Sequence, residues 1–344
     1  MTARRARPRP TSLATVDSLR SLVRSIGAAA ALAGSLATAA SAAPAEWPDR
    51  TTRIVAPFAP GSTPDVVARL LADRLSKNTG QSFYVDDKPG AGGMIGTAAI
   101  AHAPPDGATF GVSIGGPLVN NTLLYKSMAY DPFRDLAPVT RLVDQPCLLV
   151  AAPTFRASTV AAMLTELKAT PDRYGYASLG NGTVSHLVMV LIAGRAHADL
   201  TQVPYPGSAQ AVAALMAGDA ALGCLPPGNA MPQVKAGRLK LLGVASKSRS
   251  PLFPDVPTLA EQGLAGVEAN AWIGVVAPAG TPPVIVARMQ AEIAKALADP
   301  EVARTLAAQY MEPVGDRPAQ FAAYLREELA RWRPIIETNR ITLD

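Results

Sequence analysis

Three loops of this 344-residue sequence combine glycine with hydroxyl side chains just before a helical pattern begins. They span residues 57–65, 178–183 and 205–208. The first main-chain N–H groups of a helix lack partners within the helix, and together with the helix dipole they favour a bound anion. Because the first loop contains no Lys or Arg, we expect it to hold an anionic group, such as a carboxylate, without an ion pair.

The first loop contributes six candidate ligand-binding residues, which are Phe58, Pro60, Gly61, Ser62, Thr63 and Asp65. The second adds Ser178, Gly180, Asn181, Gly182 and Thr183, and the third adds Tyr205 and Gly207. Two roles are open for Asp65, since its carboxylate could cap its own helix or accept a hydrogen bond from an ammonium or hydroxyl group of the ligand. Glycine–serine loops also occur as plain connections, so the prediction depends on several loops acting together.

The elements around these loops alternate between short β-rich runs and helical patterns from Thr52 onward. We expect strands at residues 52–58, 82–86, 108–113, 147–152, 174–178, 201–204, 220–225, 240–244 and 272–277. We expect helices at residues 64–77, 94–101, 158–168, 183–195, 208–217, 282–298 and 318–338. This order predicts an α/β fold of parallel-rich sheets flanked by helices, with ligands outside the carboxyl ends of the strands. Roughly 300 residues exceed a single core of this kind, so two lobes are expected.

The N-terminal segment has a composition of its own. An arginine-rich stretch is followed by an alanine-rich apolar stretch and by an A-x-A pattern that ends at Ala42. This layout predicts a signal peptide over residues 1–42 and export from the cytoplasm, and the apolar stretch is shorter than the about 20 residues of a spanning helix. An uncleaved anchor or a misassigned start codon is the alternative.

Charge and reactive residue types argue against several classes of function. Six of the 32 basic and one of the 27 acidic residues precede Glu46, so the rest of the chain has no net charge and nucleic-acid binding is not expected. The histidines are scattered without ligand spacing, so neither a metal nor a cofactor is expected; they are His102, His186 and His197. Ser178 is not in a G-x-S-x-G elbow, and residues 90–96 depart from the G-x-G-x-x-G pattern, so no enzyme is expected.

Cys147 and Cys224 are the only cysteines of the chain. An oxidising compartment would permit a disulfide between them, and two buried free thiols are an equal alternative. Neither their spacing nor their neighbours indicate a metal site or a redox pair.

A set of short segments follows the order typical of one receptor family. The segments are 57–61, 88–96, 105–107, 130–132, 178–187, 203–205, 235–237, 254–258 and 277–282. In these segments, which are distributed over nearly all of the chain after the leader, the sequence resembles the substrate receptors of tripartite tricarboxylate transporters, also called Bug receptors. The resemblance implies a periplasmic, monomeric binding protein of the two-lobed type II kind, which closes on a small organic carboxylate and delivers it to a membrane transporter. A membrane sensor that reads the same closure is the alternative partner, and an exported α/β hydrolase is the enzyme alternative.

The same resemblance implies how the lobes are built. Lobe 1 would combine residues 46–145 with residues 270–344, and lobe 2 would comprise residues 146–269, with two hinge crossings between them. The first two loops would face each other and hold the carboxylate, partly through waters. The stretch 113–121 would border the cleft, which adds Ser113 and Gly115 to the candidate residues.

The sequence departs from the family's pattern in ways that affect the ligand. Ser62 stands where a second glycine is common, Ala221 where an acidic residue is common, and Leu225 near a common polar position. Residues 113–117 also lack polar side chains that are often present there. The end of the ligand far from its carboxylate would thus meet an apolar wall. We therefore expect an aromatic or short aliphatic monocarboxylate rather than an amino acid or a tricarboxylate.

Overall fold

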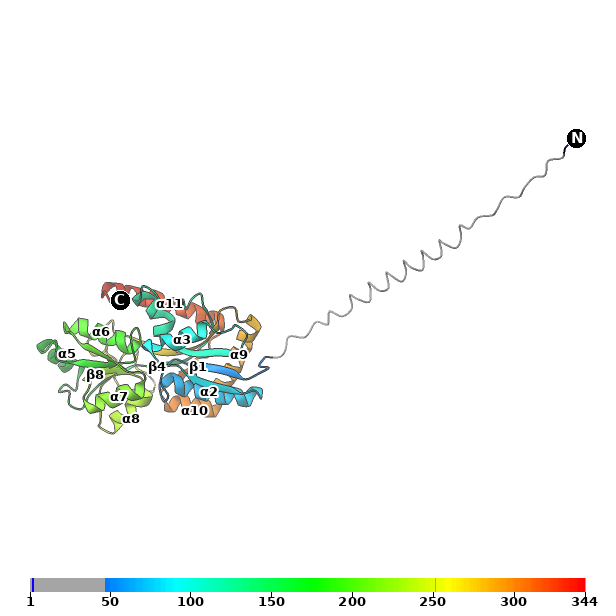
Figure 1. Cartoon of the computed structure of the whole chain (residues 1–344). Helices are drawn as coiled ribbons and strands as arrows, with labels where there is room; N and C mark the ends of the chain where they lie inside the picture. Colours follow the sequence, from blue (N-terminus) through cyan, green and yellow to red (C-terminus); the bar gives the residue numbers. More distant parts are fainter. Residues whose placement is uncertain (1, 3–46, 251, 344) are drawn as a thin grey trace. The chain divides into compact units, whose positions relative to one another are not determined.

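The computed structural model describes residue 2, residues 47–250 and residues 252–343, and the leader expected over residues 1–42 lies outside the described residues. From Trp47 onward the chain forms two β-sheets with helices packed against them (Figure 1). Within the described ranges, no helix combines the length and the apolar character that a bilayer crossing requires.

The first sheet has six strands in the order β11-β4-β10-β3-β1-β2. They are β1 (Thr52–Ala56), β2 (Phe83–Asp87), β3 (Thr109–Ile114), β4 (Leu136–Pro146), β10 (Asn270–Pro278) and β11 (Glu312–Pro313). β1 pairs in parallel with β2 and β3, whereas β10 is antiparallel to β3 and β4. The helices of this region are α2 (Thr63–Thr79), α3 (Met94–Ala101), α4 (Asn121–Leu124), α9 (Pro283–Leu297) and α10 (Pro300–Ala308).

The second sheet has five strands in the order β7-β6-β8-β5-β9. They are β5 (Leu148–Ala151), β6 (Gly175–Ser178), β7 (Thr201–Pro204), β8 (Leu222–Leu225) and β9 (Lys240–Val244). β6 pairs in parallel with β7 and β8, and β5 is antiparallel to β8 and β9. The helices that follow its strands are α5 (Val160–Ala169), α6 (Val184–Ala196), α7 (Ser208–Ala217) and α8 (Pro227–Lys235).

Both sheets are mixed, and their antiparallel strands carry the chain from one sheet to the other. β4 ends at Pro146 and β5 begins at Leu148, and the chain returns after β9 to start β10 at Asn270. The predicted two-lobed α/β architecture is confirmed, but the expectation of parallel-rich sheets is wrong, because β4, β5, β9, β10 and β11 pair antiparallel. The lobe limits at residues 145 and 270 stay a prediction. The sequence pattern did not indicate β4, because bulges in its pairing with β10 interrupt the two-residue alternation of buried side chains.

Helix α11 (Pro318–Thr338) contacts the cores of both sheets (Figure 1). Its first half contributes Phe321 and Leu325 to a buried cluster with Val55 of β1. Its second half contributes Trp332 and Ile336 to the cluster that surrounds α6. The C-terminal helix is therefore a third connection between the two sheets, in addition to the two strand crossings.

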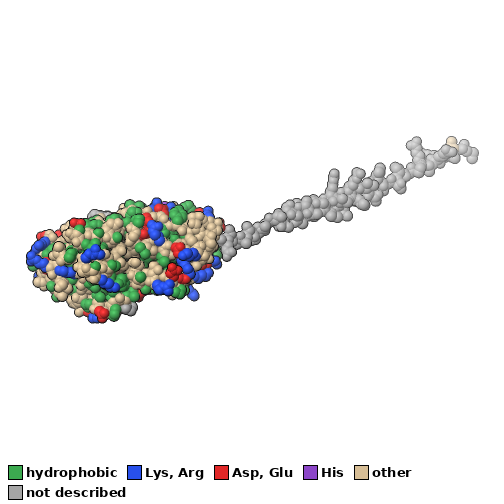
Figure 2. All heavy atoms as spheres, turned by 90° about the horizontal axis from the view of Figure 1, so that it is seen from below, with side chains coloured by type: hydrophobic (Ala, Val, Ile, Leu, Met, Phe, Trp, Pro, Cys, Tyr) green, Lys and Arg blue, Asp and Glu red, His purple; other side chains and the backbone are tan. Residues whose placement is uncertain are grey.

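Charged side chains of both signs are interspersed with hydrophobic ones on the face that Figure 2 shows. Many of the described charges are paired, for example Arg53 with Asp86 at 3.4 Å and Arg249 with Glu261 at 3.0 Å. Exposed pairs of this kind contribute little to stability. The balanced surface agrees with the absence of net charge after Ala45.

Candidate ligand-binding site

A cavity lies between the two sheets, and loops from both form its wall. Its volume is about 50 Å³, on a measure by which one water needs about 10–15 Å³. We call it the cleft cavity. Among the described residues, no Lys, Arg, His, Asp or Glu side chain lines it.

The beginnings of three helices meet at the cleft cavity. Ser62 and Thr63 precede or begin α2, Thr183 precedes α6, and Gly207 precedes α7, and all four residues line the cavity. The first turns of these helices have N–H groups that no carbonyl within the helix can accept. The positive ends of three helix dipoles therefore converge on one small space, which favours an anionic group there.

Ser62 is the side chain of the first loop that is best placed to contact a ligand. It is only 2% exposed, and its Oγ has no hydrogen-bond partner among the described residues. Although Ser62 occupies the N-cap position of α2, its side chain accepts no helix N–H. A buried hydroxyl without a partner costs free energy, so Ser62 is available to donate to a bound group.

Asp65 is used within its own loop rather than in the cavity wall. Its Oδ2 accepts the N–H of Gly61 at 2.7 Å, and its Oδ1 pairs with Arg69 Nε at 2.6 Å. Arg69 also pairs with Asp87, and burial together with the charge of Asp65 raises the pKa of Asp87 to about 6. Asp65 therefore accepts an N–H of the loop before α2 rather than one of the helix itself, and both roles that the sequence left open for it stay predictions. The N–H of Gly61 is consequently occupied inside the loop.

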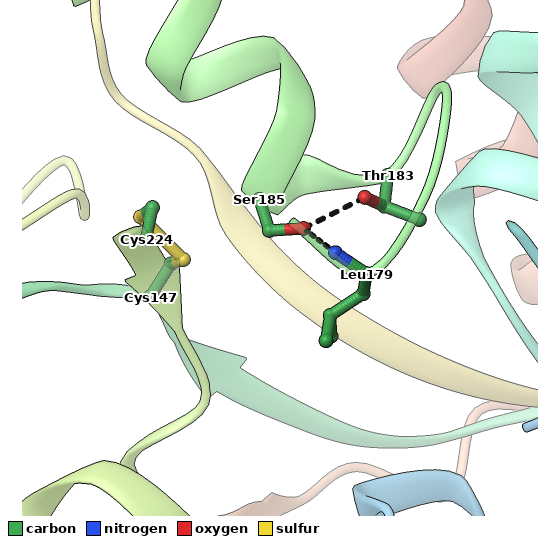
Figure 3. Close-up of a disulfide and its surroundings, with 5 residues drawn as sticks. All are labelled: Cys147, Leu179, Thr183, Ser185 and Cys224. Carbon is green, nitrogen blue, oxygen red and sulfur yellow. Dashed lines mark hydrogen bonds between the residues drawn. A yellow bond between two sulfur atoms is a disulfide. The ribbon is translucent and has the colours of Figure 1, made fainter. Parts of the chain in front are cut away.

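The hydroxyl groups of the second loop and of the helix start that follows it form hydrogen bonds within this segment (Figure 3). Ser185 Oγ accepts the N–H of Leu179 at 2.8 Å and lies 2.8 Å from Thr183 Oγ1. Thr183 Oγ1 in turn lies 2.6 Å from the carbonyl of Gly180, and Ser178 Oγ accepts the N–H of Gly180 at 3.2 Å. These bonds within the loop hold it in one conformation.

His186 completes this network from the first turn of α6. Its Nδ1 accepts the N–H of Gly182 at 3.1 Å. Burial lowers the pKa of His186 to about 4, so the ring is neutral at ordinary pH and can act as an acceptor. His186 therefore stabilises the loop and does not itself line the cleft cavity.

Loops of the two sheets contact each other directly beside the cavity. The N–H of Ala59 donates to the carbonyl of Pro206 at 3.2 Å, and Asn120 Nδ2 donates to the carbonyl of Gly182 at 2.8 Å. Gly180 has φ +105°, and a Cβ placed there would lie 2.6 Å from Cα of Gly92. Only a pair of glycines allows the two backbones to approach this closely. This approach and the two hydrogen bonds show that the two lobes are closed on each other.

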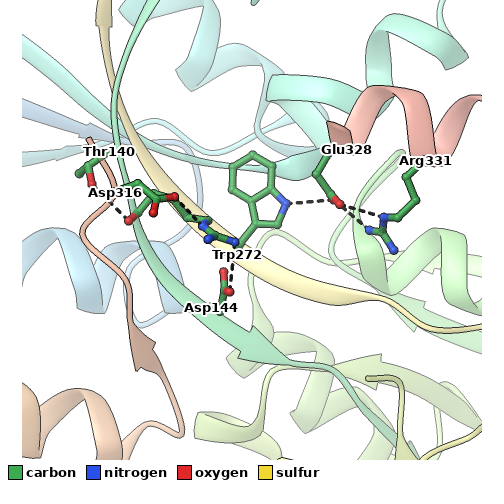
Figure 4. Close-up of polar contacts among 7 residues, drawn as sticks. Thr140, Asp144, Trp272, Asp316, Glu328 and Arg331 are labelled. Carbon is green, nitrogen blue, oxygen red and sulfur yellow. Dashed lines mark hydrogen bonds and ion pairs between the residues drawn. The ribbon is translucent and has the colours of Figure 1, made fainter. Parts of the chain in front are cut away.

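The apolar part of the cavity wall comes from the strands at the crossings. Cys147 and Cys224 line the wall and are joined as a disulfide with a Cα–Cα distance of 5.6 Å (Figure 3). Of the two alternatives for these cysteines, the structure therefore shows the disulfide. Trp272 of β10 lines the opposite part, and its Nε1 donates to Glu328 of α11 at 3.2 Å (Figure 4). Glu328 also pairs with Arg331, so α11 fixes the orientation of this indole ring.

The predicted site residues fall into three groups. Those that line the cleft cavity are Phe58, Ser62, Thr63, Gly115, Thr183 and Gly207. Those that line a second, adjoining cavity are Phe58 again, Gly180, Asn181 and Tyr205. Those that line neither are Pro60, Gly61, Asp65, Ser113, Ser178 and Gly182. Ser113, for example, points toward α3, where its Oγ lies 2.8 Å from Thr97 Oγ1.

Sequence reasoning missed the wall residues contributed by the crossing strands. Gln145, Trp272 and Ile273 line the cavity, as does the disulfide. They belong to no loop motif, and only the hinge positions proposed near Gln145 and Asn270 could have directed attention to them. Ser185 and Ser208 also line the cavity; they lie within the segments 178–187 and 205–208 but were not among the predicted site residues.

Comparisons with known proteins show the family and the fold of this chain. A family described as tripartite tricarboxylate transporter family receptor matches residues 67–341. The chain belongs to this receptor family. Protein BugT of Bordetella pertussis (strain Tohama I) is 35% identical over 305 residues, which cover 88% of this chain and 94% of BugT.

Solved structures share the fold over most of this receptor chain. The periplasmic binding protein BugD is 30% identical with a TM-score of 0.82, and the match covers 86% of this chain and 99% of BugD. A protein of R. palustris solved with adipate is 33% identical with a TM-score of 0.83, and the match covers 86% of this chain and 99% of that protein. Family and similar structures are thus solute-binding proteins, not enzymes. No group of three or more His, Cys, Asp or Glu side chains in the described ranges is placed to hold a metal ion.

Proposed function

We propose that this receptor captures a small monocarboxylate with an apolar body, by closure of its two lobes outside the cytoplasm. The carboxylate would lie at the three helix starts, and the apolar body would lie against the wall formed by Trp272, Ile273 and the disulfide. The relative solved with adipate supports the carboxylate class; adipate has two carboxylates, so the preference for a single one rests on the cavity wall of this chain. No metal or cofactor takes part.

The observation that carries this proposal is the environment of Ser62. Its hydroxyl is buried, has no partner within the protein and lies in the cavity at the N-terminus of α2. Since no cationic side chain lines the cavity, neutral donors must supply all of the protein's polar contacts to an anion. A hydrogen bond to a charged group contributes about 1.5–3 kcal/mol, more than a bond between neutral groups.

The lack of charged side chains also limits the rest of the ligand. A buried ammonium group or a second and third carboxylate would be costly unless each found a polar partner. The apolar wall supplies none, whereas an alkyl or aromatic group is favoured against Trp272 and Ile273. This reasoning supports a monocarboxylate over an amino acid or a tricarboxylate.

Isothermal titration with matched ligands tests the anionic group. We expect propionate to bind, and propionamide to bind at least about 100-fold more weakly, because the amide has nearly the same shape without the charge. Equal affinity for acid and amide would contradict the carboxylate site. Binding of citrate or glutamate alone would contradict the preference for a monocarboxylate.

Delivery to a membrane transporter of the tripartite tricarboxylate type is the accompanying proposal, and the family supports it. The leader over residues 1–42 would export the chain to the periplasm, where it would act as a monomer. Loss of ligand uptake on deletion, restored by the full chain but not by a form without the leader, is the expected result. Unchanged uptake with a lost signalling response would favour a membrane sensor as the partner instead.

A further inference from the structure

A second and larger cavity adjoins the cleft cavity. Its volume is about 310 Å³, compared with about 50 Å³ for the cleft cavity on the same measure. Its wall combines the glycine turn 90–93 of the first sheet with Tyr125, Asn181 and residues 204–206. We call it the outer cavity. The two cavities share two wall residues, Phe58 and Leu179, so these side chains separate one space from the other.

Both dividing side chains are held firmly in place. Phe58 is 2% exposed, and its ring lies so close to Gly93 that a Cβ there would be 2.9 Å from Phe58 Cε2. Leu179 is fixed through its N–H, which Ser185 accepts, and its side chain packs beside Tyr205 against the core of the second sheet. Because Phe58 comes from the first sheet and Leu179 from the second, the division is complete only when the lobes close.

The size of the cleft cavity sets a limit on what it can enclose. A volume of about 50 Å³ corresponds to about four water-sized groups. The outer cavity has room for a much larger group, and aromatic rings, prolines and glycine backbone line it together with the Asn181 amide, without charged side chains. Removing the division would therefore join the small space at the helix starts to a larger, mainly apolar one.

We propose that Phe58 and Leu179 form a partition that determines how long a carboxylate the receptor accepts. This inference rests on the proposed function and extends it to a specificity determinant. With the partition intact, short acids fit wholly inside the cleft cavity. Longer acids have to displace one of the two side chains or prevent closure.

A length series of straight-chain acids, from propionate to octanoate, measures the effect by isothermal titration. In the wild-type protein, we expect affinity to peak at short acids and to fall at least about tenfold for hexanoate and octanoate. In Phe58→Ala and in Leu179→Ala, we expect the peak to move by two or more carbons, since each further buried CH₂ strengthens binding by about fourfold. Two variants from opposite lobes keep the test valid if one of them fails to fold.

Ile114→Val is the matched control, because Ile114 lines only the cleft cavity. It removes a single carbon from that wall without opening the partition, so the peak should move by at most one carbon. An unchanged length profile in both folded partition variants would overturn the inference, as would wild-type preference for the longest acids. Failure of the wild-type protein to bind any acid would instead overturn the proposed function, and with it the inference.

Discussion

The two loops that face each other across the cleft have similar sequences but use their hydroxyl groups differently. In the first loop, Ser62 Oγ is buried without a partner. In the second loop, the hydroxyls of Ser178, Thr183 and Ser185 all make hydrogen bonds within the loop. The first loop therefore offers a donor to the ligand, whereas the second offers a rigid surface on which the lobes close.

This difference shows that a glycine–hydroxyl loop before a helix has no single role. The first loop is stabilised by a carboxylate, because Asp65 accepts the N–H of Gly61, and its serine stays unpaired. The second loop has no acidic residue, so hydroxyls and His186 accept its N–H groups instead. Substitutions in the two loops should consequently affect different properties of the protein.

The largest expected effect is on closure. Gly180→Ala would place a Cβ 2.6 Å from Cα of Gly92 on the opposite lobe, at a residue with φ +105°. Since neither backbone can yield without separating the lobes, we expect ligand affinity to fall at least about 1000-fold, or ~4 kcal/mol, by isothermal titration.

Gly237→Ala is the control for backbone strain alone. Gly237 has φ +69°, and nothing lies within 4 Å of a Cβ placed there. This variant should lose about 1–2 kcal/mol of folding stability and keep its affinity. If the ligand affinity of Gly180→Ala were within tenfold of the wild-type affinity, the backbones of Gly180 and Gly92 could not approach this closely in the ligand-bound protein.

The next effect concerns pH and the second loop. The pKa of His186 is lowered to about 4, so between pH 6.5 and pH 4 the unfolded chain binds a proton that the folded chain does not. The free energy of unfolding should therefore fall as pH falls through this window, by up to about 3 kcal/mol from His186. His186→Asn keeps an acceptor and should remove this slope in denaturant titrations at several pH values.

Two controls isolate the contribution of His186. Asp87 and Asp144 have pKa values that burial raises to about 6, so their contribution to stability is lost as pH rises and has the opposite slope. Both proteins contain these two aspartates, so subtracting the slope of the variant from that of the wild type removes their contribution. The exposed His197 has a left-handed backbone that asparagine tolerates, and His197→Asn measures the effect of the same substitution outside the loop network. Equal slopes in wild type and His186→Asn would show that His186 titrates normally.

A smaller loss of stability is expected from Ser185→Ala. The change removes the acceptor of the Leu179 N–H and a partner of Thr183 Oγ1, which should lower the free energy of unfolding by about 1–3 kcal/mol. Chemical denaturation measures it, with Ser158→Ala as the control because Ser158 is an exposed serine of the same lobe. Similar stabilities for the two variants would mean that the second loop is not held by its hydroxyls.

The smallest effect separates the two loops most clearly. Ser62→Ala removes a buried hydroxyl that has no partner within the protein, so stability should not fall and should rise by about 1 kcal/mol. Affinity for the carboxylate should fall about tenfold, since one hydrogen bond to a charged group is lost. Paired titration and denaturation experiments measure both quantities. An unchanged affinity with a lowered stability would assign Ser62 to the loop rather than to the ligand.

Local sequence signals predicted the helices and their beginnings well. The ranges 94–101, 208–217 and 318–338 agree with α3, α7 and α11, because apolar periodicity and residues such as Pro318 act within one helix. The convergence of helix starts also followed from local patterns, since strands that end at one edge bring the following loops together. By contrast, α8 has Pro232 in its interior and was not predicted, because tertiary packing overrides its weak local preference.

The sequence by itself determined an α/β chain whose glycine–hydroxyl loops begin helices and suit an anion, because propensity, capping and charge are properties of neighbouring residues. Only the tertiary structure decided which hydroxyl remains free. Ser62 and Ser185 are both serines at helix starts, and the difference between them arises from whether a loop N–H lies within reach. It also decided the apolar wall, since Trp272 and the Cys147–Cys224 disulfide reach the cavity through strand pairings between distant parts of the chain.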